Sequence, residues 1–382
     1  MTRVVVQPEM LRWARERARL DALDLAARFP KLSEWEALER QPTLRQLEAF
    51  AKATMTPVGF FFLTKPPVER LPIPDFRTMG GRVMQGTSPN LLETIYLCQQ
   101  RQGWYLDHAL VQGLPTSTFV GSETVQSPVE AVADQIRNTL TFSLDARRDC
   151  ATWEDALRQF IRQAEAVGIM VMCSGVVLNN NHRRLDPAEF RGFAMSDDRA
   201  PLIFINGADS KSAQMFTLAH ELAHLWLGQS ALSDAQPTDD DGPVVERWCN
   251  RVAAELLVPL HVFRAELKAG EGTELAMARL ARRFKVSTLV VLRRLFDAGA
   301  LSRDAFWQAY VAEVARLKTL QRPSGGGDFY LSQAARVSKR FARALVESTL
   351  EGHTLYRDAM RMLGVAKVET FNELGRSLGF PV

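Results

Sequence analysis

The sequence has few cysteines and no long hydrophobic run. Its four cysteines are far apart and form no CxxC pair; they are Cys98, Cys150, Cys173 and Cys249. This spacing argues against a disulfide framework or a zinc ribbon, so each cysteine is expected to be a small core residue. The longest apolar stretch, "GIMVMCSGVVL", is shorter than the ~20 apolar residues that a membrane helix needs and predicts a buried strand.

The chain also lacks an excess of one charge and an internal repeat. Its 47 basic and 44 acidic side chains leave a net charge of +3. That value is too small to predict nucleic-acid binding from overall electrostatics, although local basic patches stay open. The opening "MTRVVVQPEMLRWARERARL" has no apolar core of the kind found in signal peptides. We therefore expect a cytoplasmic protein with no membrane association.

The order of local patterns predicts an α+β fold that is predominantly helical and contains a small sheet. Helical periodicity runs through 90–110, 129–140 and 152–168, and three strand-like runs follow: "GIMVMCSGVV", "EFRGFAM" and "APLIFING". Next come a helix ending at Gly228, an acidic loop "SALSDAQPTDDDGP", and a second helix closed by Pro259. The remainder is helical on both sides of "QRPSGGGD", a predicted flexible linker.

The helix before Gly228 contains "FTLAHELAHLWLG", in which two of the six histidines lie four residues apart. On a helix His220 and His224 share one face, about 6 Å apart, and can bind one Zn²⁺. Glu221 follows the first histidine and can act as general base toward a water in this HExxH arrangement. The other interpretation is an amphipathic helix whose histidines make ordinary hydrogen bonds. A chance HExxH is expected in roughly one such chain in a hundred or fewer.

A catalytic zinc needs a third protein ligand. The continuation HExxHxxGxxH is absent, because Leu227 and Ser230 stand where its glycine and last histidine would be. Glu246 lies 22 residues after His224 on the next predicted helix, and Asn250 is one turn further, where it can orient a liganding histidine.

Other third ligands stay open. Glu255 is the main rival, although its neighbours Leu256 and Leu257 suggest that its face meets solvent. His182 and His261 are looser candidates, since a lone histidine is more often structural than a ligand.

These residues resemble the ImmA/IrrE-type metallopeptidases, bacterial and phage zincins that typically cut helix-turn-helix repressors. The resemblance covers roughly 134–259 and is carried by "IFING", "FTLAHELAHLWLG" and "ERWCNRVAAELLVP". It implies a zincin-like fold of the gluzincin kind. The implied zinc ligands are His220, His224 and Glu246, and the implied general base is Glu221.

The resemblance also implies a place for substrate. In related zincins the strand before the HExxH helix pairs with extended peptide, so "PLIFIN" is expected to bind substrate by adding it as one more strand. The residues concerned are Ile203, Phe204, Ile205 and Asn206. Val252 stands where the family often has phenylalanine, a change that we assign to packing.

The first 65 residues resemble an Xre helix-turn-helix with one shortened part. Only eight residues separate "DLA" (24–26) from "WE" (35–36), with Pro30 among them, where the complete motif has about four more. A recognition helix needs such residues to read bases in the major groove. We therefore expect a docking or dimerisation module, with weak DNA binding as the alternative.

A second helix-turn-helix is conceivable in "LARRFKVSTLVVLRRLFDAG", over 280–299. Four arginines there could contact phosphates: Arg282, Arg283, Arg293 and Arg294. A structural helical pair that follows the peptidase core is an equal alternative.

The chain is accordingly expected to be a zinc endopeptidase in five parts. These are an Xre-like domain (1–68), a linker and helical region (69–125), a zincin-like domain (126–268), a helical part (269–320) and a C-terminal helical segment (328–382). Its expected partner is a protein encoded nearby, such as a repressor, toxin or antitoxin, in a stress, defence or toxin–antitoxin context. The alternative is an Xre-family regulator or antitoxin that uses the zincin fold as a scaffold.

Overall fold

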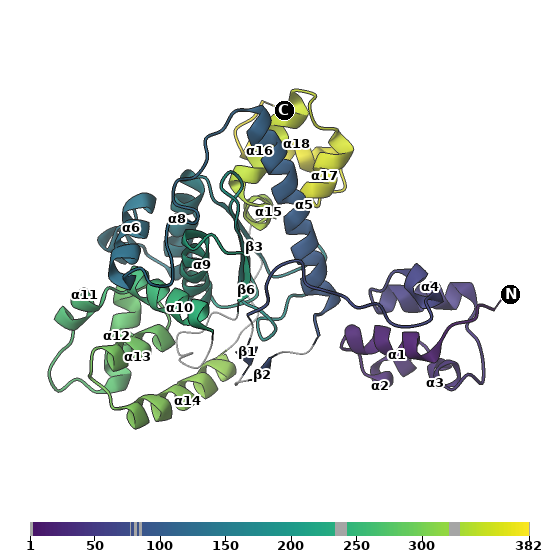
Figure 1. Ribbon diagram of the computed structural model, residues 1–382, viewed down its shortest axis with the longest axis horizontal. Helices are drawn as coiled ribbons and strands as arrows, with labels where there is room; N and C mark the ends of the chain where they lie inside the picture. The colour runs from purple at the N-terminus through teal and green to yellow at the C-terminus, as the bar shows by residue number, and fades with distance from the viewer. Residues whose placement is uncertain are drawn as a thin grey trace. The chain divides into compact units, whose positions relative to one another are not determined.

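The computed structural model describes residues 3–76, 78–79, 82–83, 86–233, 243–320 and 329–381 (Figure 1). The chain divides into two compact units, one made of 1–72 with 84–96 and the other of 73–83 with 97–382. The fold is mainly helical with one small mixed sheet, which confirms the predicted class. Within the ranges described, no helix is both long and apolar enough to cross a membrane. The five-part division stays a prediction.

The first unit is a bundle of short helices around an aromatic core. Its elements are α1 (Pro8–Arg17), α2 (Ala22–Ala26), α3 (Leu32–Glu36), α4 (Leu44–Ala53) and the 3-10 helix η1 (Val58–Phe62). Thr43 and Gln46 form a capping box that fixes the start of α4. Phe50 lies at the centre of the core, and its ring contacts those of Phe29, Trp35 and Phe61.

The second unit contains a four-stranded sheet in the order β3-β5-β4-β6. Its strands are β3 (Met170–Ser174), β4 (Gly192–Met195), β5 (Leu202–Asn206) and β6 (Ala231–Ser233). The pair β3–β5 is parallel, whereas β4 runs antiparallel to both β5 and β6. A separate pair joins β1 (Thr78–Met79) to β2 (Arg82–Val83). The strand β6 was not predicted, because it lies at the start of the stretch expected to be an acidic loop.

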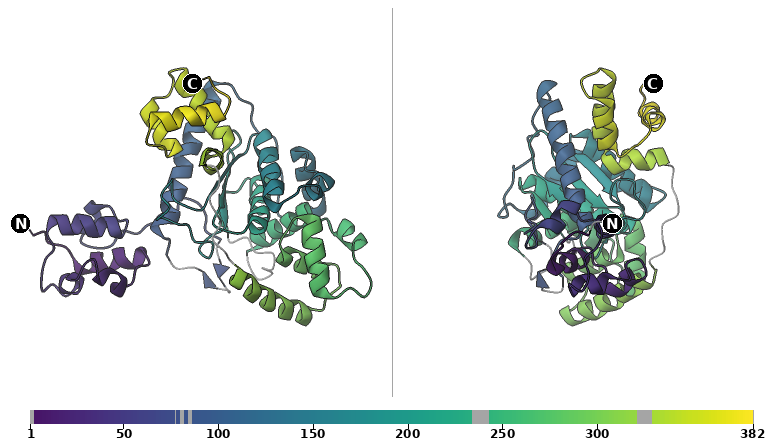
Figure 2. Two further views of the ribbon diagram at one scale, coloured as in Figure 1. Left: turned by 180° about the vertical axis from the view of Figure 1, so that it is seen from behind. Right: turned by 90° about the vertical axis from the view of Figure 1, so that its right-hand side faces the viewer.

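Further helices belong to the described ranges, and some of them pack on this sheet. The further helices are α5 (Pro89–Val111), α6 (Val129–Leu140), α7 (Leu144–Arg148), α8 (Trp153–Ala166), α9 (Lys211–Trp226), α10 (Val244–Leu257), α11 (Leu260–Ala265), α12 (Thr273–Phe284), α13 (Thr288–Asp297), α14 (Arg303–Leu320), α15 (Phe329–Val337), α16 (Lys339–Leu350), α17 (Tyr356–Leu363) and α18 (Val368–Ser377). In Figures 1 and 2 the helices α16–α18 lie beside α5. Arg101 of α5 donates a hydrogen bond to the Met362 carbonyl there, at 3.0 Å.

The helix α9 is the central element of the core. Every residue from Gln214 to Trp226 is buried, and the helix packs against α8, α10 and the sheet. Its start is capped by Ser210, whose side chain accepts from the Ala213 amide. Gly228 follows its end at φ +67°, and a Cβ there would lie 2.9 Å from the Gly121 Cα, so glycine is required for both reasons.

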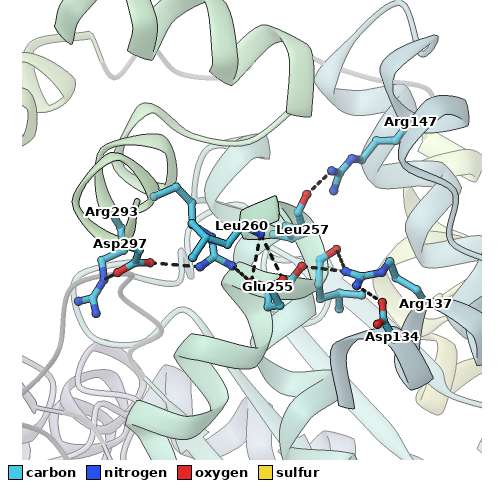
Figure 3. Close-up of polar contacts among 10 residues, drawn as sticks. Asp134, Arg137, Arg147, Glu255, Leu257, Leu260, Arg293 and Asp297 are labelled. Carbon is cyan, nitrogen blue, oxygen red and sulfur yellow. Dashed lines mark hydrogen bonds and ion pairs between the residues drawn. The ribbon is translucent and has the colours of Figure 1, made fainter. Parts of the chain in front are cut away.

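Arginines from three other helices hold the C-terminal end of α10. Figure 3 labels two of them, Arg137 and Arg147. Arg137 Nη1 donates to the carbonyls of Glu255 (2.8 Å) and Leu256 (3.1 Å), and Arg147 donates to that of Leu257. These bonds satisfy the carbonyls that a helix end leaves without partners. Arg294 forms an ion pair with the Glu255 carboxylate at 2.7 Å. The expectation that Glu255 meets solvent is therefore wrong.

Candidate metal centre

The helices α9 and α10 bring three potential ligands together. One turn of α9 places His220 and His224 on the same face, where their Nε2 atoms lie 3.1 Å apart. Glu246 in the first turn of α10 reaches both, with carboxylate oxygens 3.1 Å from His220 Nε2 and 3.0 Å from His224 Nε2. All three side chains are buried. Among the residues described, this is the one group of three that could hold a metal ion.

The spacing of these atoms fits a bound metal. Tetrahedral Zn²⁺ with bonds of about 2.0–2.1 Å separates its ligand atoms by about 3.3 Å, close to the distances found here. Two imidazoles and one carboxylate are also a donor set that zinc accepts, with a fourth position left open. The family's implied metal is therefore compatible with the residues present.

The protonation of the cluster also favours a cation. Burial alone would raise the pKa of Glu246, but the adjacent His220 and His224 bring it down to about 2. Burial lowers the pKa of His224, and Glu246 offsets part of that change. A carboxylate and a neutral imidazole are the forms that bind metal.

Asn250, one turn after Glu246, contacts the first histidine. Its Oδ1 lies 2.9 Å from His220 Nδ1, so it can accept a hydrogen bond from the N–H at that nitrogen, which leaves Nε2 available to a metal. This is the place that the sequence analysis proposed for Asn250.

Glu221 is fully buried beside the ligands and has no well-formed hydrogen bond to protein atoms at either carboxylate oxygen. Burial raises its pKa well above the usual value, and the nearby Glu246 adds to the rise. The Ser233 hydroxyl acts in the opposite direction on this pKa. Burying a carboxylate without a firm partner costs free energy, and such groups are found mainly where a ligand or a catalytic role requires them.

Ser233 and Phe76 belong to this site and were missed by the sequence analysis. The Ser233 hydroxyl, on β6, lies 3.3 Å from His224 Nε2. The Phe76 ring is stacked on that of His224, with centroids 6.4 Å apart and planes at 10°. Neither residue is part of a motif, because each is brought to the histidines by strand pairing that sequence patterns do not report.

The rival ligands lie elsewhere. Glu255 is occupied by Arg294 and by the Leu260 amide, which donates to its carboxylate at 3.2 Å. His182 and His261 are exposed and do not join the cluster.

The structure contradicts strand addition on β5. This strand pairs with β3 along one edge and with β4 along the other, so neither edge is open to a peptide. The side chains of Ile203, Phe204, Ile205 and Asn206 are all buried in the sheet. Asn206 also uses its amide to donate to the Phe190 carbonyl at 3.1 Å. A peptide therefore cannot add to the sheet at β5.

The arginines proposed for phosphate contacts on α12 and α13 are largely used within the fold. Arg283 pairs with Glu266 at 3.1 Å and Arg293 with Asp297 at 2.9 Å. Arg294 is buried against Glu255, so the structure contradicts a phosphate contact by this residue. Arg282 remains exposed. The two helices share the hydrophobic core with α9 and α10, which favours the structural interpretation.

Comparison with known families agrees with this geometry. Residues 164–296 match the IrrE N-terminal-like domain family of M78 peptidases, and this match includes α9, α10, α12 and nearly all of α13. This part of the chain is therefore a domain of the ImmA/IrrE type. A second match, over residues 337–377, is to a domain of unknown function, DUF8813, and falls on the C-terminal helices.

Two curated relatives are similar to part of the chain. The radiation response metalloprotease IrrE of Deinococcus radiodurans is 36% identical over 106 residues, which cover 26% of this chain and 32% of that protein. Its counterpart in Deinococcus deserti is 38% identical over 109 residues, covering 27% of this chain and 39% of that protein. The chain thus matches well under half the length of these relatives. The similarity indicates an IrrE-type peptidase domain and, with it, a bound metal.

Proposed function

We propose that this chain is a zinc-dependent endopeptidase with His220, His224 and Glu246 as ligands. The observation that carries the proposal is the convergence of three buried ligand atoms from α9 and α10 beside the buried carboxylate of Glu221. Zn²⁺ bound there would act as a Lewis acid toward a peptide carbonyl and lower the pKa of a bound water.

The surrounding residues have separate tasks in this proposal. Glu221 takes a proton from the attacking water and passes it to the leaving amine, which its position next to the ligands and its lack of a firm protein partner allow. Asn250 holds the ring of His220 in the required orientation. Burial of the whole cluster keeps bulk water out and strengthens each electrostatic interaction.

We further propose that the substrate is a specific protein encoded nearby, such as a repressor, toxin or antitoxin. The peptidase site supplies chemistry but little selectivity, because backbone hydrogen bonds to an extended peptide suit most sequences. Selectivity must then come from docking on one of the helical parts, which raises the effective concentration of the scissile segment. The stress, defence or toxin–antitoxin setting and the cytoplasmic location belong to the same proposal.

The test measures metal and cleavage on the full chain. His220→Ala and Glu246→Ala are expected to lose most of the roughly one zinc per chain that elemental analysis should find, because three protein ligands are the minimum. Glu221→Gln should keep zinc but lose at least 100-fold in cleavage of the neighbouring gene product. His261→Ala, at an exposed histidine, is the control and should change neither property. Zinc retained by Glu246→Ala, or full activity of Glu221→Gln, would contradict the assignment.

A further inference from the structure

The edge strand of the sheet near the metal centre is already paired with another part of the chain. The Leu232 amide in β6 donates to the Pro74 carbonyl at 2.8 Å, and the Phe76 amide donates to the Leu232 carbonyl at 3.0 Å. These bonds form a parallel bridge between Asp75 and Leu232. The other side of β6 is paired with β4. The segment 73–76 thus adds to the sheet in the way that a bound peptide does.

The same segment contacts one of the proposed ligands. Phe76, half-buried, stacks on the ring of His224, which is itself fully buried. Ile73, three residues earlier, is only 7% exposed and anchors the other end. Two backbone hydrogen bonds and two apolar side chains thus hold this short segment in one register against β6.

The outer edge of β6 leads to the reactive groups. Leu232 is the paired residue, and the next residue, Ser233, has its hydroxyl 3.3 Å from His224 Nε2. A peptide that took the place of the segment would lie beside the liganding histidine. The strand β5, whose two edges are both paired, does not offer such a place.

We propose that the outer edge of β6 is the substrate-binding edge of this domain and that residues 73–76 occupy it as an internal inhibitor. The favoured substrate is an extended peptide with an aromatic side chain that stacks on His224 and an apolar side chain three residues before it. This inference rests on the proposed peptidase function and names both its substrate class and its regulation.

The connection of the segment to the rest of the chain makes it an effective competitor. A tethered segment has an effective concentration of about millimolar, so a separate peptide must bind more tightly or wait for the segment to leave. Pro72 and Pro74 restrict φ and reduce the entropy lost when the segment is fixed. On both sides the segment is joined in sequence to the first unit, which contains residues 1–72 and 84–96.

The test removes the aromatic anchor and offers the segment as a separate peptide. Full-length protein with Glu221→Gln, which prevents cleavage, is titrated into a fluorescein-labelled peptide of sequence LPIPDFRTM, and anisotropy gives its Kd. Adding Phe76→Ala is expected to tighten binding at least tenfold, because the edge is vacated. Phe76→Tyr, which keeps the ring, should behave like the parent.

Two controls exclude general effects. Phe380→Ala removes another half-buried phenylalanine, one that packs on Arg343, and should leave the Kd unchanged. The peptide with alanine in place of its phenylalanine should bind the Phe76→Ala protein at least tenfold more weakly. Hydrogen exchange should show the Leu232 amide protected in the parent and exposed in Phe76→Ala without added peptide. Equal Kd values for the parent and Phe76→Ala, or no loss of Leu232 protection, would overturn the proposal.

Cleavage separates this inference from the function on which it rests. With Glu221 intact and zinc bound, Phe76→Ala should cut the neighbouring gene product several-fold faster than the parent. If the parent cleaves the gene product but the peptide binds all variants equally, the inhibitory role of 73–76 is wrong and the proposed peptidase function stands. If the peptide binds Phe76→Ala selectively but no variant cleaves, the binding edge stands and the peptidase is wrong.

Discussion

Gly192 shows how a single residue sets the distance between the sheet and the helix that carries the histidines. A Cβ at this position of β4 would lie 2.5 Å from Thr217 Cγ2, 2.8 Å from the Phe204 carbonyl oxygen and 3.2 Å from Glu221 Oε1. The first two distances are shorter than real Cβ contacts. A side chain here must therefore push α9 away from β4 and shift Glu221.

The expected result is that Gly192→Ala destabilises the second unit by about 1–3 kcal/mol, the usual cost of overpacking a core. Gly103→Ala is the matched control, since nothing lies within 4 Å of a Cβ there and the residue is exposed within α5. That change should stabilise by about 0.5–1 kcal/mol, because alanine is the better helix former. Urea unfolding followed by circular dichroism measures both, and shifts of the same sign would contradict the explanation.

At the scale of elements, the position of α10 depends on the buried pair of Arg294 and Glu255 as well as on its contact with α9. Both side chains are only 6% exposed, and Arg294 also contacts Asp297 at 3.1 Å. Removing one partner would leave an uncompensated buried charge at the end of the helix that supplies Glu246.

Arg294→Ala is therefore expected to cost about 3–5 kcal/mol in the free energy of unfolding. Replacing both partners, as Arg294→Met with Glu255→Gln, should recover most of this loss, because no charge of the pair is then left alone and the glutamine can still accept from Leu260. Arg148→Ala, at an ion pair with Asp145 that is exposed on both sides, should change little. Equal losses for Arg294→Ala and Arg148→Ala would show that the buried pair has no special part in stability.

The length and charge of the helix α3 bear on whether the first unit binds DNA. This helix has five residues, of which Leu32 and Trp35 are buried. Its two carboxylates make ion pairs, Glu34 with Arg40 at 3.3 Å and Glu36 with Arg15 at 3.5 Å. A helix of this length with acidic side chains is poorly suited to the major groove.

We therefore expect at most weak DNA binding, with a Kd in the range of about 10⁻⁶–10⁻⁴ M at physiological salt and a similar value for every sequence. Fluorescence anisotropy with labelled duplexes at several salt concentrations tests this on the full chain. Nanomolar, sequence-selective binding that survives removal of zinc would instead support the regulator or antitoxin alternative.

At the scale of the whole molecule, the proposed metal ligands all belong to one of the two units. A ligand that binds the folded state alone stabilises that state, by about 2.7 kcal/mol when its concentration is 100 times Kd. Because the ligands come from α9 and α10, this stabilisation should be confined to the second unit.

Scanning calorimetry of the zinc-loaded protein is expected to show the transition of the second unit fall by about 5 °C when a chelator removes the metal. The transition of the first unit should not move. His220→Ala should show the lower transition from the start and no response to the chelator. A uniform shift of both transitions, or a response that persists in His220→Ala, would place the metal elsewhere.

The sequence alone determined the parts of this protein that depend on local geometry. The 3.6-residue period of a helix places His220 and His224 on one face wherever that helix lies. The same period places Glu221 at the side of that face. The apolar runs likewise predicted β3, β4 and β5. For the third ligand, spacing left Glu246 and Glu255 both open, and the family resemblance favoured Glu246.

Tertiary structure decided everything that depends on pairing between distant segments. Packing of α10 on α9 turns Glu246 toward the histidines. Arg294 lies 39 residues after Glu255 in the chain and keeps the Glu255 carboxylate buried away from the histidines. Strand order placed β5 inside the sheet and made the three-residue β6 its edge, which no periodicity in so short a stretch can reveal. The same pairing brought Phe76 onto His224, since strand neighbours are selected by burial and hydrogen bonding across the fold rather than by local sequence.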